Sequence, residues 1–345
     1  MRRALIAAGV AAITVLAAAC GSSGSSSSSG SSGGSGSSGP VTLRLGFLAN
    51  VTHAPALVGI KEGFFTKNLG DGVTLKLTPF STGTEESTAL LAGQLDAAYV
   101  GPNPAIKAWQ TSNGKLIKVI SGAASGGAAL VVKKSITGPA QLKGQSLATP
   151  SLGNTQDVAA RYWLKQQGLT TSATGGGDVA IKPTTPNSAA VLEFKSGQIV
   201  GGSEPSPYDV EMVQDGGKVL LSEPGTTTVL MVTQSFLSAH PAVVNDLLKA
   251  NLDALNYIKS DPSGAQAAAN AELAATTGKP LKSAVLGPAW KEITFTADPD
   301  AASLSADAQQ AETVGLLKPV NLSGIFDLTP LNNLLSAAGQ SSVSG

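Results

Sequence analysis

The sequence predicts an α/β fold, and two observations support this prediction. From residue 41 onward, short apolar strands alternate with helical stretches, which is typical of parallel βαβ units. The same order of strand, polar loop and helix then occurs a second time, which indicates a duplicated architecture. A hydrophobic share of 42% is sufficient for a packed core.

The elements of the first half follow from local patterns. Apolar and polar residues alternate over 41–48, and Pro55 is well placed in the first turn of a helix that runs to about residue 63. The next elements are a strand at 73–77, a helix at 85–92 and a strand at 96–100.

The second half repeats this order. We expect strands at 145–149, 179–182 and 198–202, with helices ending near residues 167 and 196. Each half joins a helix to a strand through Gly-Gln and an apolar residue, and each continues into a Pro-x-Pro turn. The repeated connections favour duplication over coincidence.

Two segments of small residues connect the halves. Ser121–Gly127 lies between predicted strands at 116–120 and 128–132, and Glu223–Thr226 lies between strands at 218–221 and 228–233. The two segments form either ordinary turns or a double hinge. We expect a hinge, because glycine allows large changes in backbone conformation. The predicted first lobe comprises residues 41–124 and 226–340, including a helical tail, and the second lobe comprises residues 125–225.

The N-terminal residues resemble a lipoprotein leader. Two arginines precede an apolar run, which is shorter than the ~20 residues of a membrane span. The run ends in Leu-Ala-Ala-Ala-Cys20-Gly, which resembles a bacterial lipobox. We expect residues 1–20 to be a signal peptide ending at a lipidated Cys20, the alternative being an incidental cysteine. Residues 21–40, almost entirely Gly and Ser, would form a flexible tether, and the protein would be anchored at the extracytoplasmic face of the plasma membrane.

Composition excludes several classes. Equal numbers of basic and acidic residues, 23 of each, argue against a nucleic-acid partner. A single cysteine excludes an internal disulfide framework and a Cys-rich metal site. The sequence has no Walker loop, H-E-x-x-H motif or EF-hand loop, so we expect no metal and no cofactor.

Candidate ligand-binding residues follow the predicted strands. Ligands of open parallel sheets bind beyond the carboxyl ends of the strands, beside helix N-termini. Such termini bind small anions without a cationic side chain, although each polar residue could instead cap its own helix. Arg44 and Arg161 lie within a strand and a helix, away from these loops. The candidates are Asn50, Thr52, His53, Ser81, Thr82, Gly83, Thr84, Gly101, Pro102, Asn103, Gly153, Asn154, Thr155 and Glu204.

Four of the side chains near these loops allow more than one interpretation. His53 is a ligand contact, a helix cap or a surface imidazole. Glu204 meets an amine of the ligand or is an exposed carboxylate. Phe80 and Tyr99 wall an apolar part of the pocket or belong to the core.

Several stretches, in this order, carry a family resemblance. They are Thr52–Gly59, Leu90–Ala98, Leu142–Ala148 and the pair Glu204-Pro205 shortly before Tyr208. The chain resembles the periplasmic substrate-binding proteins of the nitrate, sulfonate and taurine ABC importer family. The resemblance implies a two-lobed periplasmic-binding-protein type II fold with parallel-rich sheets flanked by helices, a double hinge and a cleft that closes on a ligand. Ser203 stands where the family often has Trp, which argues against a heteroaromatic ligand.

The expected function is therefore the substrate-binding component of an ABC importer. It would capture a small anion such as a sulfonate, taurine or nitrate and deliver it to a membrane permease, as a monomer and without catalysis. The alternatives are an extracellular enzyme on the same scaffold and a cell-envelope lipoprotein without a small-molecule ligand.

Overall fold

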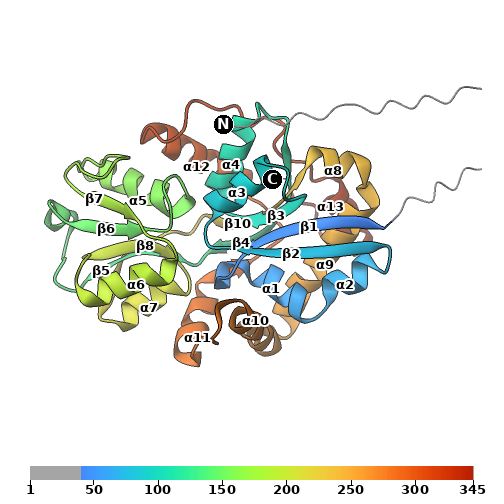
Figure 1. Ribbon diagram of the computed structural model, residues 1–345, viewed down its shortest axis with the longest axis horizontal. Helices are drawn as coiled ribbons and strands as arrows, with labels where there is room; N and C mark the ends of the chain where they lie inside the picture. Colours follow the sequence, from blue (N-terminus) through green and yellow to red (C-terminus); the bar gives the residue numbers. More distant parts are fainter. Residues whose placement is uncertain (1–39, 345) are drawn as a thin grey trace, which may run out of the picture. The chain divides into compact units, whose positions relative to one another are not determined.

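The structure, a computed structural model, describes residues 40–344. These residues form two mixed β-sheets flanked by helices (Figure 1). The first sheet has six strands in the order β11-β4-β10-β3-β1-β2, and the second has five in the order β7-β6-β8-β5-β9. The predicted α/β fold is confirmed. Cys20 and the other leader and tether residues up to 39 lie outside the described part of the chain.

In the first sheet, β1 pairs in parallel with β2 and β3, as βαβ units require. Strand β10 is antiparallel to β3 and β4, and β11 is antiparallel to β4. The sheet is mixed because the chain leaves along β4 and returns along β10, which the βαβ pattern alone does not predict. The strands are β11 (Ile293–Phe295), β4 (Ile117–Gly126), β10 (Thr226–Thr233), β3 (Ala97–Val100), β1 (Val41–Leu48) and β2 (Val73–Phe80).

The second sheet has the same mixture. Strand β6 is parallel to β7 and β8, whereas β5 is antiparallel to β8 and β9. Strand β8 begins three residues later than predicted, because Gly197 ends the preceding helix with a φ of 80° and the chain then needs several residues to reach the sheet. The strands are β7 (Ala180–Pro183), β6 (Ser146–Thr149), β8 (Gly201–Pro205), β5 (Ala128–Lys133) and β9 (Gly217–Ser222).

Helices connect the strands, and the sequence predicts those that begin near residues 55, 85, 155 and 187, but not Phe64–Leu69, Pro102–Thr111 or Tyr208–Gln214. Short 3₁₀ helices occur at Val51–His53 (η1) and Pro139–Leu142 (η2). The α-helices of this part are α1 (Ala54–Lys61), α2 (Phe64–Leu69), α3 (Gly83–Leu91), α4 (Pro102–Thr111), α5 (Thr155–Gln166), α6 (Asn187–Ser196) and α7 (Tyr208–Gln214).

The tail is helical, as expected. Helix α9 packs against α1 and α2, and α10 packs against α1, so this part of the tail covers the first sheet. Helices α11 and α12 also contact α7 and α5 of the second half, which the sequence did not predict. The tail helices are α8 (Gln234–Ala239), α9 (Pro241–Ser260), α10 (Pro262–Thr277), α11 (Ser283–Lys291), α12 (Ala301–Thr313) and α13 (Thr329–Ala337). Among the described residues, no helix is both long enough and apolar enough to cross a membrane.

The two connections between the sheets lie side by side. The backbone N–H of Gly126 donates a hydrogen bond to the carbonyl of Gly225, at 2.8 Å. The first connection is shorter than predicted, because β4 continues through the small-residue segment as far as Gly126. A Cβ at Gly122 would stand 2.3 Å from the carbonyl oxygen of Asp298, so small residues here serve close backbone packing. The turn itself is confined to Gly126 and Gly127, which have φ values of 73° and 71°.

Candidate functional site

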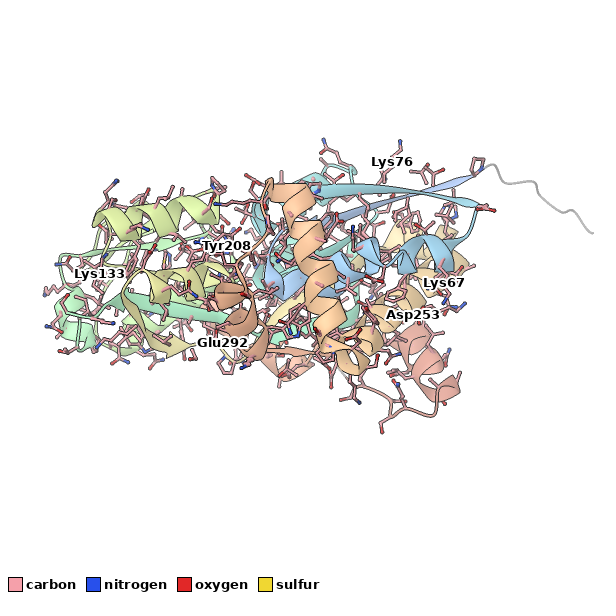
Figure 2. All side chains as sticks on the ribbon, turned by 90° about the horizontal axis from the view of Figure 1, so that it is seen from below. Lys67, Lys76, Lys133, Tyr208, Asp253 and Glu292 are labelled. Atoms are coloured by element: carbon pink, nitrogen blue, oxygen red, sulfur yellow. The ribbon has the colours of Figure 1, made fainter. Side chains whose placement is uncertain are left out.

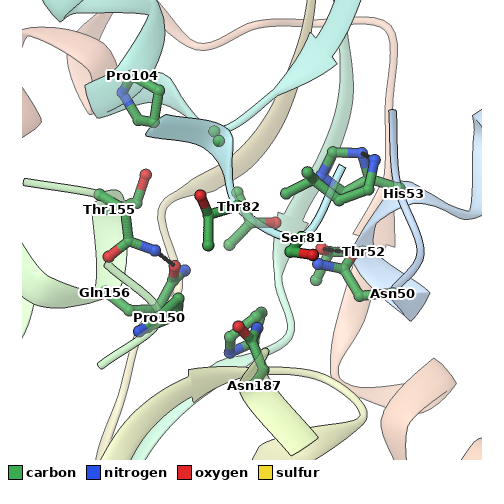
Figure 3. A pocket seen from close by; sticks show the side chains of 16 residues that line it. Asn50, Thr52, His53, Ser81, Thr82, Pro104, Pro150, Thr155, Gln156 and Asn187 are labelled. Carbon is green, nitrogen blue, oxygen red and sulfur yellow. Dashed lines mark hydrogen bonds between the residues drawn. The ribbon is translucent and has the colours of Figure 1, made fainter. Parts of the chain in front are cut away.

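A small polar cavity lies where loops and helix ends of the two halves meet (Figure 3). Its volume is about 30 Å³. Figure 3 shows Thr155 and Gln156 at the left, Ser81 and Asn50 toward the right, Thr82 between them and Asn187 below. The lining residues are Leu48, Asn50, Thr52, His53, Ser81, Thr82, Gly83, Gly101, Pro104, Pro150, Asn154, Thr155, Gln156, Asn187, Pro205 and Thr227.

Helix N-termini supply much of this lining. Thr82 caps α3 and Gly101 caps α4, both in the first half, while Asn154 caps α5 and Asn187 begins α6 in the second. The first N–H groups of a helix have no partner within the helix and carry a partial positive charge. The cavity therefore gathers donor-rich helix ends from both halves.

The caps do not exclude a binding role for the same residues. Thr82 Oγ1 accepts a hydrogen bond from the N–H of Glu85 at 3.2 Å, and Asn154 Oδ1 accepts one from the N–H of Asp157 at 2.9 Å. A hydroxyl that accepts a bond from its own helix still has a proton to donate. Thr82 can therefore cap its helix and also donate a hydrogen bond into the cavity.

The η1 segment contributes a second set of polar groups. Thr52 Oγ1 donates to Asn50 Oδ1 at 2.8 Å, and the N–H of Leu48 donates to His53 Nδ1 at 3.2 Å. His53 is buried, so the surface-imidazole interpretation is wrong. Burial lowers the pKa of His53 to about 3. The imidazole is therefore neutral at physiological pH and supplies a polar wall without a charge.

The loop before α5 is held by a carboxylate that the sequence reasoning missed. Asp157 Oδ2 accepts hydrogen bonds from the Gly153 N–H and from Arg161 Nε, both at 2.9 Å. Asp157 Oδ1 accepts one from Thr149 Oγ1 at 2.9 Å. Asp157 thereby fixes the turn that presents Asn154 to the cavity. The Asn154-x-x-Asp spacing at a helix start was the available signal.

No lysine or arginine lines the polar cavity among the residues described. Lys67, Lys76 and Lys133 lie toward the ends of the described body, while Tyr208 and Glu292 lie nearer its middle (Figure 2). Arg44 instead pairs with Asp96 between strands, and Arg161 pairs with Asp157 inside α5. Cationic side chains are thus kept away from the cavity, as the sequence suggested.

Nine of the fourteen candidates line the polar cavity: Asn50, Thr52, His53, Ser81, Thr82, Gly83, Gly101, Asn154 and Thr155. Three others, Thr84, Asn103 and Gly153, line a neighbouring cavity of about 330 Å³ between α3, α4 and the start of α5. Thr84 Oγ1 lies 2.8 Å from Ser151 Oγ and so bridges the two halves. Pro102 and Glu204 line neither cavity, although Pro102 begins α4.

Glu204 is not the exposed carboxylate that the sequence allowed. It lies in β8, between β6 and β5, and is fully buried. Neither carboxylate oxygen has a hydrogen-bond partner within residues 40–344. Burial, and then repulsion from Asp209 and Glu223, raises the pKa of Glu204 well above its usual range. Glu204 is therefore a buried acid within β8, and its burial favours the protonated form.

The two aromatic candidates, Tyr99 and Phe80, lie in different surroundings. Tyr99 is buried in the core of the first half and donates a hydrogen bond to Asn251 Oδ1 at 2.9 Å. Phe80 lines a second cavity of about 440 Å³. This second cavity shares Leu48, Asn50, Ser81 and Asn187 with the polar cavity and adds apolar side chains and two charged ones, Glu211 and Lys279. A polar pocket thus adjoins a larger, partly apolar one.

Seven lining residues are not among the fourteen candidates: Leu48, Pro104, Pro150, Gln156, Asn187, Pro205 and Thr227. Thr227 belongs to β10, whose antiparallel return was not foreseen. Gln156 and Asn187 lie in the first turns of their helices, and the expected helix starts were the signal that could have identified them. No group of three or more His, Cys, Asp or Glu side chains within residues 40–344 is arranged to hold a metal ion.

Two solved structures with the same fold are those of binding proteins. The alkanesulfonate-binding protein SsuA from Xanthomonas axonopodis pv. citri, solved with bound MOPS, superposes with a TM-score of 0.70 at 17% identity, covering 85% of this chain and 100% of that one. The periplasmic nitrate-binding protein NrtA from Synechocystis PCC 6803 superposes with a TM-score of 0.71 at 14% identity, covering 86% and 89%. At these identities the similarity establishes the fold, which is that of the periplasmic binding proteins.

The sequence identifies the family. Residues 36–275 match the model of the NMT1-like family, and the chain belongs to that family. It is also 27% identical over 215 residues to the taurine-binding periplasmic protein of Escherichia coli (strain K12). That alignment covers 60% of this chain and 64% of the relative, which is less than two thirds of the relative's length. The resemblance to nitrate, sulfonate and taurine binding proteins is confirmed.

Proposed function

We propose that this protein is the solute-binding component of an ABC importer and that it holds a small organic anion, an alkanesulfonate or taurine, in the polar cavity. The observation that carries the proposal is the convergence of helix N-termini from both halves on a cavity that no Lys or Arg of residues 40–344 lines. Helix ends and hydroxyls bind oxyanions through hydrogen bonds and partial charges.

The dimensions favour an organic anion over a bare inorganic one. The polar cavity, at about 30 Å³, holds a group of only a few atoms, whereas the adjoining second cavity measures about 440 Å³. A sulfonate group would occupy the polar cavity, and its carbon chain would extend into the second cavity toward Phe80 and Tyr208. For taurine, Glu211 in the second cavity would receive the ammonium group.

Asn187 supports the presence of a ligand. Its Oδ1 atom is buried and has no hydrogen-bond partner among the described residues. Buried side-chain amides are ordinarily satisfied, and either end of an amide can face a ligand. With the amide turned so that Nδ2 faces the cavity, Asn187 would donate a hydrogen bond to a sulfonate oxygen.

We propose residues 41–124 with 226–340 as one lobe and 125–225 as the other, closing about the paired connections near Gly126 and Gly225. The division of strands between the two sheets supports these boundaries. Closure would place the helix ends of one lobe against those of the other, and the ligand would leave to a permease when the lobes open. Small-angle scattering with and without the ligand would test closure.

We further propose binding without catalysis. His53 is neutral and accepts a hydrogen bond from the backbone. The ring of His240, at the start of α9, is tilted against that of Phe236, with ring centroids 4.9 Å apart. Within residues 40–344, neither histidine is hydrogen-bonded to a nucleophilic side chain. Recovery of chemically unchanged ligand after prolonged incubation would support this proposal, and a time-dependent product would reject it.

The decisive experiment is calorimetry on the purified protein with taurine, ethanesulfonate and nitrate. We expect ethanesulfonate or taurine to bind more tightly than nitrate. Absence of heat with all three would reject the ligand class. A Thr82→Val variant, which removes a donor but keeps the shape of the side chain, should bind more weakly than Thr88→Val, which alters an exposed hydroxyl later in α3.

The cellular location is also a proposal. We propose that Cys20 is lipidated, that the Gly/Ser segment tethers the folded body to the extracytoplasmic face of the membrane, and that the body acts as a monomer. Mass spectrometry of the mature N-terminus would detect a diacylated cysteine, and a Cys20→Ser variant should be released from the membrane. Light scattering would give the oligomeric state.

A further inference from the structure

A further cavity, which we call the acidic cavity, differs in chemistry from the polar cavity. It is formed by three elements: α5, α12 and the connection from β9 to β10. Helices α5 and α12 pack against each other at this place (Figure 1). Its volume is about 550 Å³, within the range of cavities that hold small organic ligands.

The charged groups of the acidic cavity have one sign. Glu223, Asp300 and Asp307 line it, and no lysine or arginine of the described part of the chain does. These carboxyl groups would repel the anion that we propose for the polar cavity. A cavity of this composition attracts a cation.

One carboxylate oxygen of Asp307 is unsatisfied within residues 40–344. Its Oδ2 atom is buried and receives no hydrogen bond from the described residues. Burial, and then repulsion from Glu223 and Asp300, raises the pKa of Asp307 well above its usual range. Glu223 is similarly placed: burial raises its pKa to about 8, although Ser203 Oγ donates a hydrogen bond to its Oε1 atom. A positive charge between these two carboxyl groups would stabilise both ionised forms.

Aromatic side chains complete the wall. Tyr162 and Trp163, adjacent in α5, both line the acidic cavity and are half-buried. Aromatic faces attract ammonium groups, and this attraction strengthens where water is excluded. A compact metal ion has no arranged set of three ligands here or elsewhere in residues 40–344. Aromatic and acidic walls together fit an organic ammonium better than a metal ion.

We infer that the acidic cavity is a second binding site, which takes a small organic ammonium compound between the carboxyl groups of Glu223 and Asp307 and the rings of Tyr162 and Trp163. This site does not depend on the proposed anion function. It adjoins the polar cavity, because Thr155 and Thr227 line both. An occupant would contact α5, α12 and the connection between the lobes at once.

Choline and its neutral analogue 3,3-dimethylbutan-1-ol provide the test, because they have nearly the same shape and differ in charge. Calorimetry on the purified protein should show binding of choline, and binding of the alcohol at least about tenfold weaker. Equal binding of the two compounds would overturn the inference. Absence of binding by choline, tetramethylammonium and putrescine would also overturn it.

Variants locate the site. Asp307→Asn should weaken choline binding at least about tenfold, whereas Asp71→Asn, at an exposed loop position, should leave it unchanged. Fluorescence gives an independent measurement: choline should alter the emission of the wild-type protein, and Trp163→Phe should abolish the change while Trp109→Phe keeps it. If choline binds equally well to Asp307→Asn and the Trp163→Phe signal is retained, the ligand lies elsewhere and the assignment is wrong.

Discussion

Asp157 and Arg161, one turn apart in α5, form an ion pair that is buried on both sides, with 2.9 Å between Oδ2 and Nε. Arg161 also donates from Nη1 to the carbonyl of Ser172 at 2.9 Å, and its Nη2 atom has no partner among the described residues. The same Asp157 carboxylate holds the Gly153 N–H at the start of the helix. One ion pair therefore connects the interior of the second half to the loop that lines the polar cavity.

The first prediction concerns this pair. Asp157→Asn leaves the Arg161 guanidinium buried without a counter-charge, and breaking a buried pair in this way costs about 3–5 kcal/mol. Denaturant unfolding should show a loss of this size. The control is Asp215→Asn, which breaks the exposed pair with Lys195 and should change stability by about 0–1 kcal/mol. Equal effects in the two variants would contradict the interpretation.

Much of the site could be predicted because parallel strands end at the same edge of a sheet. Thr82 and Asn154 follow strands in different halves, and a polar residue before a helix marks an N-terminus in the sequence. Which side of such a helix faces the partner half depends on packing. Gln156 was missed for this reason.

The wrong placement of Glu204 and the omission of Thr227 both arise from the extent and direction of strands. Glu204 was placed in a loop because strand β8 was expected to end near residue 202, yet β8 runs to Pro205 as an inner strand. A shift of three residues moves a carboxylate from the predicted loop into the core. Thr227 was missed because β10 returns antiparallel to β4, and long-range pairing of this kind leaves no local pattern in the sequence.

The second prediction follows from the burial of Glu204. Its pKa is raised in the folded protein, so the folded state holds its proton more tightly than the unfolded state does. This contribution to stability is fully present at pH values below the ordinary carboxyl pKa and is lost as pH rises toward the raised value. Glu204→Gln should therefore raise the melting temperature at pH 8 more than at pH 4.5.

Two comparisons sharpen this test. Glu62→Gln, at an exposed position after α1, should leave the pH profile of the melting temperature unchanged. Asp209 and Glu223, whose pKa values burial raises to about 7 and about 8, should keep part of the pH dependence in Glu204→Gln. A Glu204→Gln variant that is less stable than wild type at pH 8 would show that the carboxylate has a partner there.

The third prediction concerns the charge of His53. Burial lowers its pKa to about 3, so the ring should remain neutral at pH 5. The chain has only two histidines, and imidazole nitrogen spectra of protein without an affinity tag should therefore be simple. One resonance should stay in the neutral form at pH 5, and it should persist in His240→Gln. A shift of that resonance to the protonated form near pH 6 would show that water reaches the His53 ring.

The fourth prediction tests closure of the two halves through Gly101. This residue caps α4 with φ −66° and ψ 153°, which alanine also adopts, but a Cβ would stand 2.8 Å from Thr155 Oγ1 across the polar cavity. Gly101→Ala should therefore hold the halves apart and weaken binding of the sulfonate by about tenfold, or about 1.4 kcal/mol, while stability changes little. Gly72→Ala, where a Cβ has open space, is the matched control. Calorimetry measures both, and unchanged affinity in Gly101→Ala would mean that the bound form does not close through this contact.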